Sequence, residues 1–288
     1  MSISKDVLRK KLKSIFGYSS FRRKQEEIIL NLLANNDSMV IMPTGGGKSM
    51  CYQLPALLSE GCAIIVSPLI ALMKNQVDVL RGFYQNNNIA HVLNSSLTKT
   101  QTNQVKSDII NGITKLVYVA PESLIKQENI QFLKKTKISL FAIDEAHCIS
   151  EWGQDFRPSY LGIGERLNNL SQNKELPSLS LTGTASISVR DDILNEVGIQ
   201  IVDELRSSDF IRPELEFKVE NNEDGDKDKK IKILIDFLQS GLPELTESKN
   251  LKNFFESKES EIENNLVIIF VPTKAKKTID IYKKLKTF

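Results

Sequence analysis

The stretch that most constrains the fold of this chain is Met42-Pro-Thr-Gly-Gly-Gly-Lys-Ser49. It follows a short apolar run, Met39-Val40-Ile41, and precedes residues that can continue as a helix. A strand, a glycine-rich turn and a helix start form a cradle for phosphate groups, because backbone N–H groups point at the anion. In such a cradle Lys48 supplies a positive charge and the Ser49 hydroxyl can ligate Mg²⁺. The general pattern G-x-x-x-x-G-K-[ST] has a glycine where this chain has Met42, so the loop alone is also compatible with a flexible turn and a surface lysine.

A second motif, Ser139-Leu-Phe-Ala-Ile-Asp-Glu-Ala-His147, favours the first of these interpretations. Its apolar half predicts a buried strand that delivers Asp144 and Glu145 at its carboxyl end, where nucleotide-hydrolysing sites keep their acids. Asp144 would hold Mg²⁺ directly or through water, and Glu145 would orient and deprotonate the attacking water. Adjacent acids also occur on solvated loops, but the two motifs together predict a site that hydrolyses a nucleotide.

Segments that alternate between strand and helix patterns predict an α/β fold. Several of the strands are continuously apolar, which favours a parallel sheet covered by helices on both faces. Strands are predicted at residues 39–41, 63–66, 89–93, 116–120, 140–143 and 179–181, and helices at about residues 8–16, 28–33, 50–54, 69–84, 100–110, 123–134 and 187–196.

The composition changes after about Arg212, which predicts a second domain. Residues 212–239 hold a charged loop at 221–230 and a predicted helix at 231–239. Residues 240–265 are rich in Ser, Glu, Lys and Asn and are expected to form a flexible insertion. An apolar strand at 266–271 and a helix at 274–285 follow, so residues 266–288 are expected to open a second α/β domain after a first domain at 1–211.

The composition excludes several classes of site and location. Three cysteines and two histidines lack metal-ligand spacing, so no zinc is expected. The N-terminus opens no signal-peptide core, and no apolar run is long enough to cross a membrane, which predicts an intracellular protein with no membrane partner. The net charge of +2 does not by itself indicate a nucleic-acid partner, so such a partner has to be argued from local sites.

Several stretches resemble the helicase core of the RecQ family of DNA helicases, within helicase superfamily 2. The family lacks the first glycine of the phosphate loop, so Met42 fits the resemblance. The resemblance includes a segment just after the Asp-Glu motif that matches the RecQ aromatic-rich loop. At residues 181–185 the chain has Gly183 where alanine is usual, which is expected to loosen that turn slightly. The matching stretches are Phe16-Gly-Tyr-Ser-Ser-Phe-Arg-Arg-Lys-Gln25, the phosphate loop, Ser67-Pro-Leu-Ile-Ala-Leu-Met-Lys-Asn-Gln76, Tyr118-Val-Ala-Pro-Glu-Ser123, Ala142-Ile-Asp-Glu-Ala-His-Cys-Ile-Ser-Glu-Trp-Gly-Gln-Asp-Phe-Arg-Pro158 and Leu181-Thr-Gly-Thr-Ala185.

The resemblance implies a RecA-like P-loop NTPase domain that binds ATP with Mg²⁺. Gln25 would present a donor and an acceptor to the adenine edge, while Tyr18 and Arg22 would stack on the base or touch its sugar and phosphates. Packing within a helix is the alternative for Tyr18. The implied ATP-binding set is Tyr18, Arg22, Gln25, Pro43, Thr44, Gly45, Gly46, Gly47, Lys48 and Ser49, with Ser49 and Asp144 as metal ligands and Lys48, Asp144 and Glu145 as catalytic residues.

The resemblance also implies DNA with a single-stranded region as a partner. Trp152 and Phe156 would stack on unpaired bases and Arg157 would reach a phosphate, whereas burial in the core is the alternative for a lone tryptophan. His147 would couple the domains, with simple packing as its alternative. The remaining implied DNA-binding or coupling residues are Ser67, Asn94, Pro121, Glu122, Thr182 and Thr184. The protein is expected to be monomeric and to act with DNA, in the nucleus of a eukaryote (favoured by the low-complexity insertion) or in the cytoplasm and nucleoid of a bacterium.

One family feature is missing from these 288 residues. The late Gln-x-x-Gly-Arg-x-Gly-Arg motif, which supplies an arginine finger from the second domain, does not occur. The expected function is therefore an ATP-dependent 3′–5′ DNA helicase of RecQ type, here as a fragment. The alternative is an ATP- and DNA-binding module that is catalytically incomplete and has no motor activity. A P-loop kinase is disfavoured by the adenine motif and the aromatic loop.

Overall fold

The computed structural model describes residues 3–153, 155–171, 176–199 and 204–206. The chain divides into two units, Met1–Arg212 and Pro213–Phe288, and all of the described residues belong to the first. The elements predicted between residues 221 and 285 lie outside the described residues. Among the helices that are described, none combines the length and the apolar character needed to cross a membrane.

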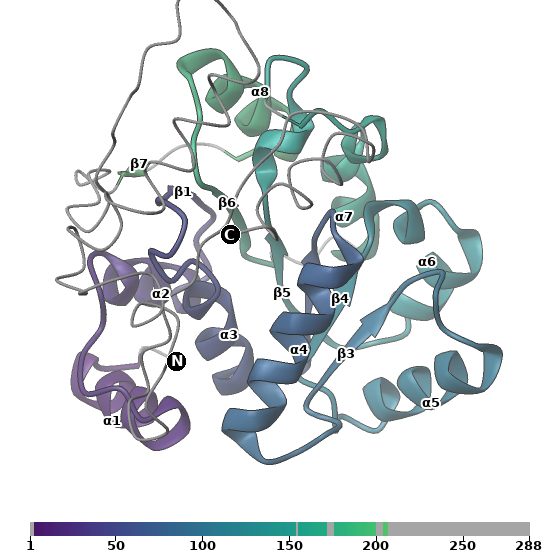
Figure 1. The fold of residues 1–288 in the computed structure, drawn as a ribbon, viewed down its shortest axis with the longest axis horizontal. Coiled ribbons are helices and arrows are strands. Elements are labelled where there is room, and N and C mark those ends of the chain that lie inside the picture. Colours follow the sequence, from purple (N-terminus) through teal and green to yellow (C-terminus); the bar gives the residue numbers. More distant parts are fainter. Residues whose placement is uncertain (1–2, 154, 172–175, 200–203, 207–288) are drawn as a thin grey trace, which may run out of the picture. The chain divides into compact units, whose positions relative to one another are not determined.

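The centre of the described region is one parallel sheet, confirming the predicted fold class (Figure 1). The strand order is β3-β4-β2-β5-β6-β1-β7, and every neighbouring pair is parallel. The strands are β1 (Ser38–Ile41), β2 (Cys62–Val66), β3 (Ala90–Leu93), β4 (Leu116–Val119), β5 (Ile138–Ile143), β6 (Ser178–Thr182) and β7 (Glu204–Arg206). Because all strands run the same way, their carboxyl ends meet at a single edge of the sheet.

Helices cover both faces of this sheet, and the alternation of side chains along each strand explains why. In β2, Ala63 and Ile65 belong to the core beneath helices α1 to α4, whereas Ile64 and Val66 belong to the core beneath α5 to α8. Both faces are therefore apolar, as expected for a buried parallel strand. The helices are α1 (Lys5–Phe16), α2 (Gln25–Leu33), α3 (Met50–Leu58), α4 (Ile70–Tyr84), α5 (Lys99–Ile110), α6 (Gln127–Leu133), α7 (Ile163–Ser171) and α8 (Ile187–Val197).

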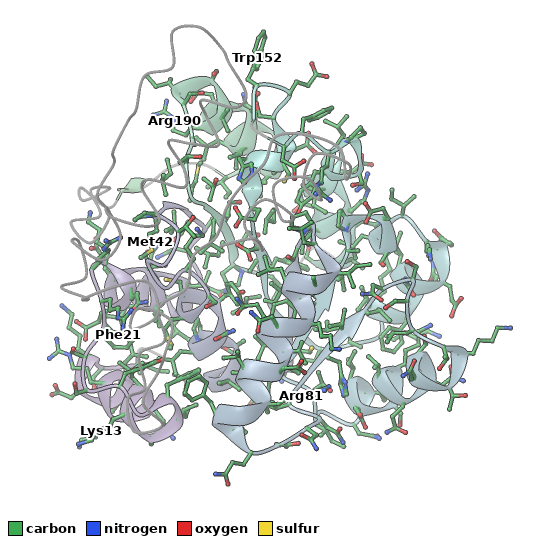
Figure 2. The ribbon with its side chains drawn as sticks, viewed as in Figure 1. Lys13, Phe21, Met42, Arg81, Trp152 and Arg190 are labelled. Atoms are coloured by element: carbon green, nitrogen blue, oxygen red, sulfur yellow. The ribbon has the colours of Figure 1, made fainter. Side chains whose placement is uncertain are left out.

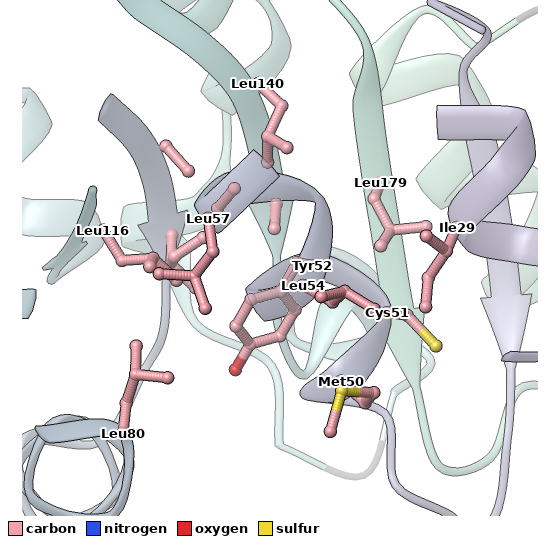
Figure 3. Packing of buried hydrophobic residues seen from close by; sticks show 14 of the residues in the cluster. Ile29, Met50, Cys51, Tyr52, Leu54, Leu57, Leu80, Leu116, Leu140 and Leu179 are labelled. Atoms are coloured by element: carbon pink, nitrogen blue, oxygen red, sulfur yellow. The ribbon is translucent and has the colours of Figure 1, made fainter. Parts of the chain in front are cut away.

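Helix α3 is the most deeply buried of these helices. Eight of its nine residues are buried, from Met50 to Leu57. In Figure 3 its Tyr52 and Leu54 have Leu116 on one side, and Leu179 and Ile29 of α2 on the other. Since α3 directly follows the phosphate loop, this packing fixes the base of the loop against the sheet.

Local capping sets the ends of several helices. Ser4 caps α1 by accepting a hydrogen bond from the Val7 N–H, and Gly17 ends the helix in the left-handed conformation at φ 75°. In α5, Thr98 and Gln101 form a reciprocal capping box. The α1 boundary agrees with the predicted stop at Gly17.

The structure differs from the predicted elements in three places. The helix predicted at 123–134 is divided into a 3₁₀ turn, Pro121–Leu124, and the shorter α6, because Lys126 has extended backbone at ψ 117°. Helix α7 was not predicted, although Ile163, Leu167 and Leu170 have helical spacing and are all buried. Strand β7 was also not predicted, since three residues give no usable periodicity.

Candidate functional site

The two motifs and the predicted coupling segment meet at the carboxyl edge of three neighbouring strands. The phosphate loop follows β1, Asp144 follows β5, and Thr182 is the last residue of β6, which lies between them. Ile41 pairs with Thr182, and the Met42 N–H donates to the Thr182 carbonyl at 3.0 Å. Ligands of open α/β sheets bind at this edge, so the topology brings the sequence-predicted residues to one site.

The phosphate loop is shaped by its glycines. Gly45 and Gly47 have φ of 78° and 82°, a region that favours glycine. A Cβ on Gly46 would lie 2.8 Å from the Pro43 carbonyl oxygen, so a larger residue would force the loop to shift. Within the described part of the chain, the backbone N–H groups of Gly45, Gly47, Lys48 and Ser49 donate no hydrogen bond. These donors are therefore available to an anion.

Lys48 is held near the base of the loop. Its Nζ donates to the Met42 carbonyl at 3.3 Å, and the residue is only partly exposed.

The described residues contain no group of three or more His, Cys, Asp or Glu side chains that could hold a metal. Mg²⁺ commonly takes one or two protein ligands and completes its shell with phosphates and water, so the pair of Ser49 and Asp144 fits it.

Gln25 joins the segment before α2 to the phosphate loop. Its Nε2 donates to the Gly47 carbonyl at 2.9 Å, and its Oε1 accepts from the Arg22 N–H at 2.8 Å. The side chain is 5% exposed, which leaves one amide hydrogen and one lone pair for a base. Tyr18 packs near Phe83 of α4 with ring centroids 6.2 Å apart, yet remains 45% exposed.

Asp144 is a buried acid in an unfavourable environment. Burial, followed by the neighbouring Glu145 carboxylate, raises the pKa of Asp144 from 3.8 to about 6, although Lys48 opposes the rise. Its Oδ1 accepts a hydrogen bond from the Glu145 N–H at 3.0 Å. A divalent cation beside the carboxylate would favour its charged form. A bound metal would therefore offset the unfavourable effect of burial on the ionised carboxylate.

Glu145 adopts a strained backbone, with φ 51° and ψ 46° in the left-handed region. Non-glycine residues in this region cluster at functional sites because the surrounding fold has to hold them there. The Glu145 side chain lies near His147, with Oε2 3.4 Å from Nδ1. The same Nδ1 lies 3.0 Å from Thr182 Oγ1.

The hydrogen bonds of Thr182 determine the tautomer of a neutral His147. Thr182 Oγ1 donates its only hydrogen to the Thr184 carbonyl at 3.0 Å, so it can only accept from His147. The proton of a neutral His147 is therefore on Nδ1. The chain of contacts Glu145–His147–Thr182–Thr184 links the acid of β5 to the segment that follows β6.

The aromatic segment after β5 has one exposed ring. Trp152 is 79% exposed, and Figure 2 shows its side chain at the periphery, pointing away from the body of the protein. The backbone of Trp152 is held in place, because its N–H donates to Ser150 Oγ. Ser150 Oγ in turn donates to Asp192 of α8 at 2.5 Å. Burial in the core, the alternative for this tryptophan, is excluded, whereas Phe156 is partly buried.

Arg157 is already engaged within the protein. Its Nη1 donates to the Pro68 carbonyl at 2.9 Å and its Nη2 donates to Asp155 at 2.9 Å. A DNA phosphate would therefore compete with Asp155 for this guanidinium. The roles of Asp155, Pro68 and Asp192 in holding the segment were not predicted, because no local sequence pattern marks them.

The other residues predicted to meet DNA lie at the same carboxyl edge of the sheet but differ in exposure. Ser67 and Pro121 are buried, and no hydrogen-bond partner of Ser67 Oγ is found in the described region. Asn94 is partly exposed and accepts from the Ser96 N–H at 2.9 Å, while Glu122 is exposed. Their contacts with DNA remain predictions, and the buried pair would act through backbone or packing.

Replacing Gly183 by alanine is expected to stabilise the protein slightly. A Cβ there would lie 3.6 Å from both Lys48 Nζ and Thr44 Oγ1, which is ordinary van der Waals contact. Removing a glycine where the backbone tolerates alanine gains about 0.4–1 kcal/mol through the unfolded chain, or roughly 1–4 °C in Tm. Calorimetric unfolding of Gly183→Ala and of wild type would measure this, and a lower Tm would show that the turn needs glycine.

A comparison with protein-family models matches residues 22–193 to the DEAD/DEAH box helicases. The curated relatives include the ATP-dependent DNA helicase RecQ of Haemophilus influenzae, 43% identical over 209 residues, which are 73% of this chain and 33% of that protein. The RecQ of Bacillus subtilis is also 43% identical, over 74% of this chain and 35% of its own. The chain thus spans about a third of the length of these relatives.

Solved structures show the same RecA-like fold at low sequence identity. The DUF1998 helicase MrfA aligns with a TM-score of 0.64 at 16% identity, covering all of this chain and 42% of that one. Mycobacterium smegmatis helicase Lhr, solved with ssDNA and AMP-PNP, aligns with a TM-score of 0.55 at 17% identity, covering 69% of this chain and 27% of that one. The family match includes Gln25, the phosphate loop and the Asp-Glu motif. The chain therefore belongs to the DEAD/DEAH box helicase family and, within it, is related to the RecQ helicases.

Proposed function

We propose that this chain provides the nucleotide-binding motor domain of an ATP-dependent DNA helicase that moves 3′ to 5′ along a single-stranded region. The observation that carries the proposal is the meeting of the phosphate loop, Asp144 and Glu145, and Thr182 at the ends of β1, β5 and β6. The kinship with RecQ helicases supports DNA as the partner.

Each residue has a role that its position supports. Lys48 and the free N–H groups of the loop hold the phosphates, and Glu145 takes a proton from the attacking water. Ser49 and Asp144 would hold Mg²⁺, which neutralises developing charge on the phosphates. As charge at Glu145 changes, its contact with His147 changes as well, and Thr182 carries that change to the coupling segment.

The first test separates base from phosphate recognition. If Gln25 reads adenine, Gln25→Ala should weaken ATP binding by roughly 1–3 kcal/mol, or about 5- to 150-fold, and barely change GTP binding. Lys48→Ala should weaken both nucleotides, because it touches only phosphate. Calorimetric titration of both variants with both nucleotides measures the split.

The contacts of Gln25 sharpen the interpretation of that test. Because Gln25 also holds the Gly47 carbonyl, some loss of GTP affinity would reflect a loosened loop. Equal losses for ATP and GTP in Gln25→Ala would therefore rule out base recognition and leave Gln25 as a loop anchor.

The second test concerns DNA. Trp152→Ala is expected to weaken binding of single-stranded DNA by about 1–3 kcal/mol, the value of one stacked base, with ATP affinity and Tm unchanged. Ile110→Ala is a matched control, since Ile110 is 63% exposed at the end of α5. Fluorescence anisotropy with a labelled oligonucleotide measures the affinity, and an unchanged Kd for Trp152→Ala would contradict the stacking role.

A further inference from the structure

Arg23 has an unusual backbone conformation next to the phosphate loop. Its φ is 49°, in the left-handed region that few non-glycine residues adopt. It lies in a turn closed by a hydrogen bond of 3.1 Å from the Gln25 N–H to the Arg22 carbonyl. A strained residue of this kind persists only where the surrounding structure holds it, and it commonly marks a functional position.

The turn is fixed directly onto the loop. Gln25 contacts the carbonyl of Gly47, and Arg23 Nη1 lies 3.2 Å from the point that a Cβ on Gly46 would occupy. Gln25 therefore contacts the loop directly, and the Arg23 guanidinium lies close to the neighbouring Gly46. The hydrogen bonds of Gln25 therefore hold the backbone of the turn that carries Arg23 beside the loop.

The Arg23 guanidinium has no partner among the residues that the structure describes. Across the described residues, it makes no hydrogen bond or ion pair, and Arg23 is exposed. Its acidic neighbour Glu26 is occupied by Arg9, whose Nε lies 2.6 Å from Glu26 Oε1. This cation therefore lies beside a loop in which the backbone N–H groups of Gly45, Gly47, Lys48 and Ser49 donate no hydrogen bond within the described residues.

We propose that Arg23, in addition to the implied Arg22, is a phosphate-binding cation, which contacts the nucleotide phosphates from the α2 side of the loop while Lys48 contacts them from its base. This inference rests on the proposed nucleotide site. A guanidinium forms paired, charge-assisted hydrogen bonds with phosphate oxygens, which a loop built only of N–H groups cannot supply. Arg23 thereby adds affinity for the phosphates without reading the base.

The variant Arg23→Gly tests the proposal cleanly. Glycine accepts the positive φ, so the variant removes the guanidinium while keeping the turn, and the Tm of the nucleotide-free protein should stay level or rise slightly. The Kd values for Mg-ATP and Mg-GTP should both rise, each by about 10- to 100-fold, the usual loss for a hydrogen bond to a charged group. Arg23→Lys should lose less than Arg23→Gly because it keeps a point charge.

Two comparisons make the outcome decisive. Lys24→Ala removes the next exposed cation of the same turn and should leave both Kd values unchanged. If Arg23→Gly binds like wild type while Lys48→Ala loses affinity, Arg23 has no phosphate role and the proposed function stands. A loss confined to ATP would assign Arg23 to the base and overturn the proposal. If neither Lys48→Ala nor Arg23→Gly loses affinity, the nucleotide site itself is wrong.

Discussion

Residues 1–288 alone are expected to bind Mg-ATP and to hydrolyse it about 10³- to 10⁵-fold more slowly than a protein that also carries an arginine finger. Lys48, Ser49, Asp144 and Glu145 can position phosphates, metal and water on one side of the nucleotide. No Gly-Arg-x-Gly-Arg sequence is present to neutralise charge from the opposite side. The missing charge corresponds to roughly 4–7 kcal/mol of transition-state stabilisation.

A chimera makes this expectation measurable. Residues 1–212 joined to the part of the Haemophilus influenzae RecQ that follows its aligned stretch should regain DNA-stimulated ATPase activity and duplex unwinding, since the 209 aligned residues are 43% identical. The matched variant Glu145→Gln should then abolish hydrolysis in the chimera while keeping ATP binding, because it removes the base but not the phosphate contacts.

The alternative, a binding module without motor activity, predicts the opposite result for the chimera. Failure of a folded chimera to hydrolyse ATP, with both nucleotide and DNA still bound, would favour that module. Robust unwinding by residues 1–288 alone would instead show that this chain, or a second copy of it, supplies the missing positive charge.

The sheet, and the positions of the phosphate loop and the acids after its strands, could be predicted because they depend on short-range signals. Buried parallel strands are continuous apolar runs, and the loop and acids at their ends are read from residue type alone. Even the stop of α1 at Gly17 comes from one glycine that adopts positive φ. The phosphate loop after β1 and the acids after β5 could therefore be placed from the sequence alone.

Contacts between residues on different strands could not be predicted from the sequence. The contact of His147 with Thr182 joins residues 35 positions apart, and it depends on β6 lying between β5 and β1. Arg23 was not singled out because its type and neighbours suggest only a solvated turn, whereas the role proposed for it rests on its φ and on the nearby Gly46. The exposed position of Trp152, by contrast, was expected from the resemblance, and the structure excludes its alternative, burial in the core.

Asp144→Asn is expected to stabilise the protein at neutral pH, although it removes a predicted metal ligand. The folded-state pKa of Asp144 is raised from 3.8 to about 6, because burial and Glu145 disfavour the charged carboxylate. A raised carboxyl pKa gives a stabilising contribution that is complete below pH 3.8 and is lost as the pH rises through 6. The ionised group therefore costs roughly 3 kcal/mol at about pH 7.5, and the neutral amide avoids this cost.

Chemical denaturation in EDTA without nucleotide, repeated across pH, measures the expected difference. The variant and wild type should be equally stable near about pH 4, and the variant should gain up to roughly 3 kcal/mol above about pH 6, or about 6–12 °C in Tm. Asp78→Asn, which removes an exposed carboxylate of α4, should show no such pH-dependent gain.

If Asp144→Asn is less stable than wild type at neutral pH, the attraction of Lys48 outweighs burial and the Asp144 carboxylate stabilises the fold. A gain would instead mean that the fold tolerates an unfavourable charge at this position, which is what a site built to receive a metal and phosphates requires.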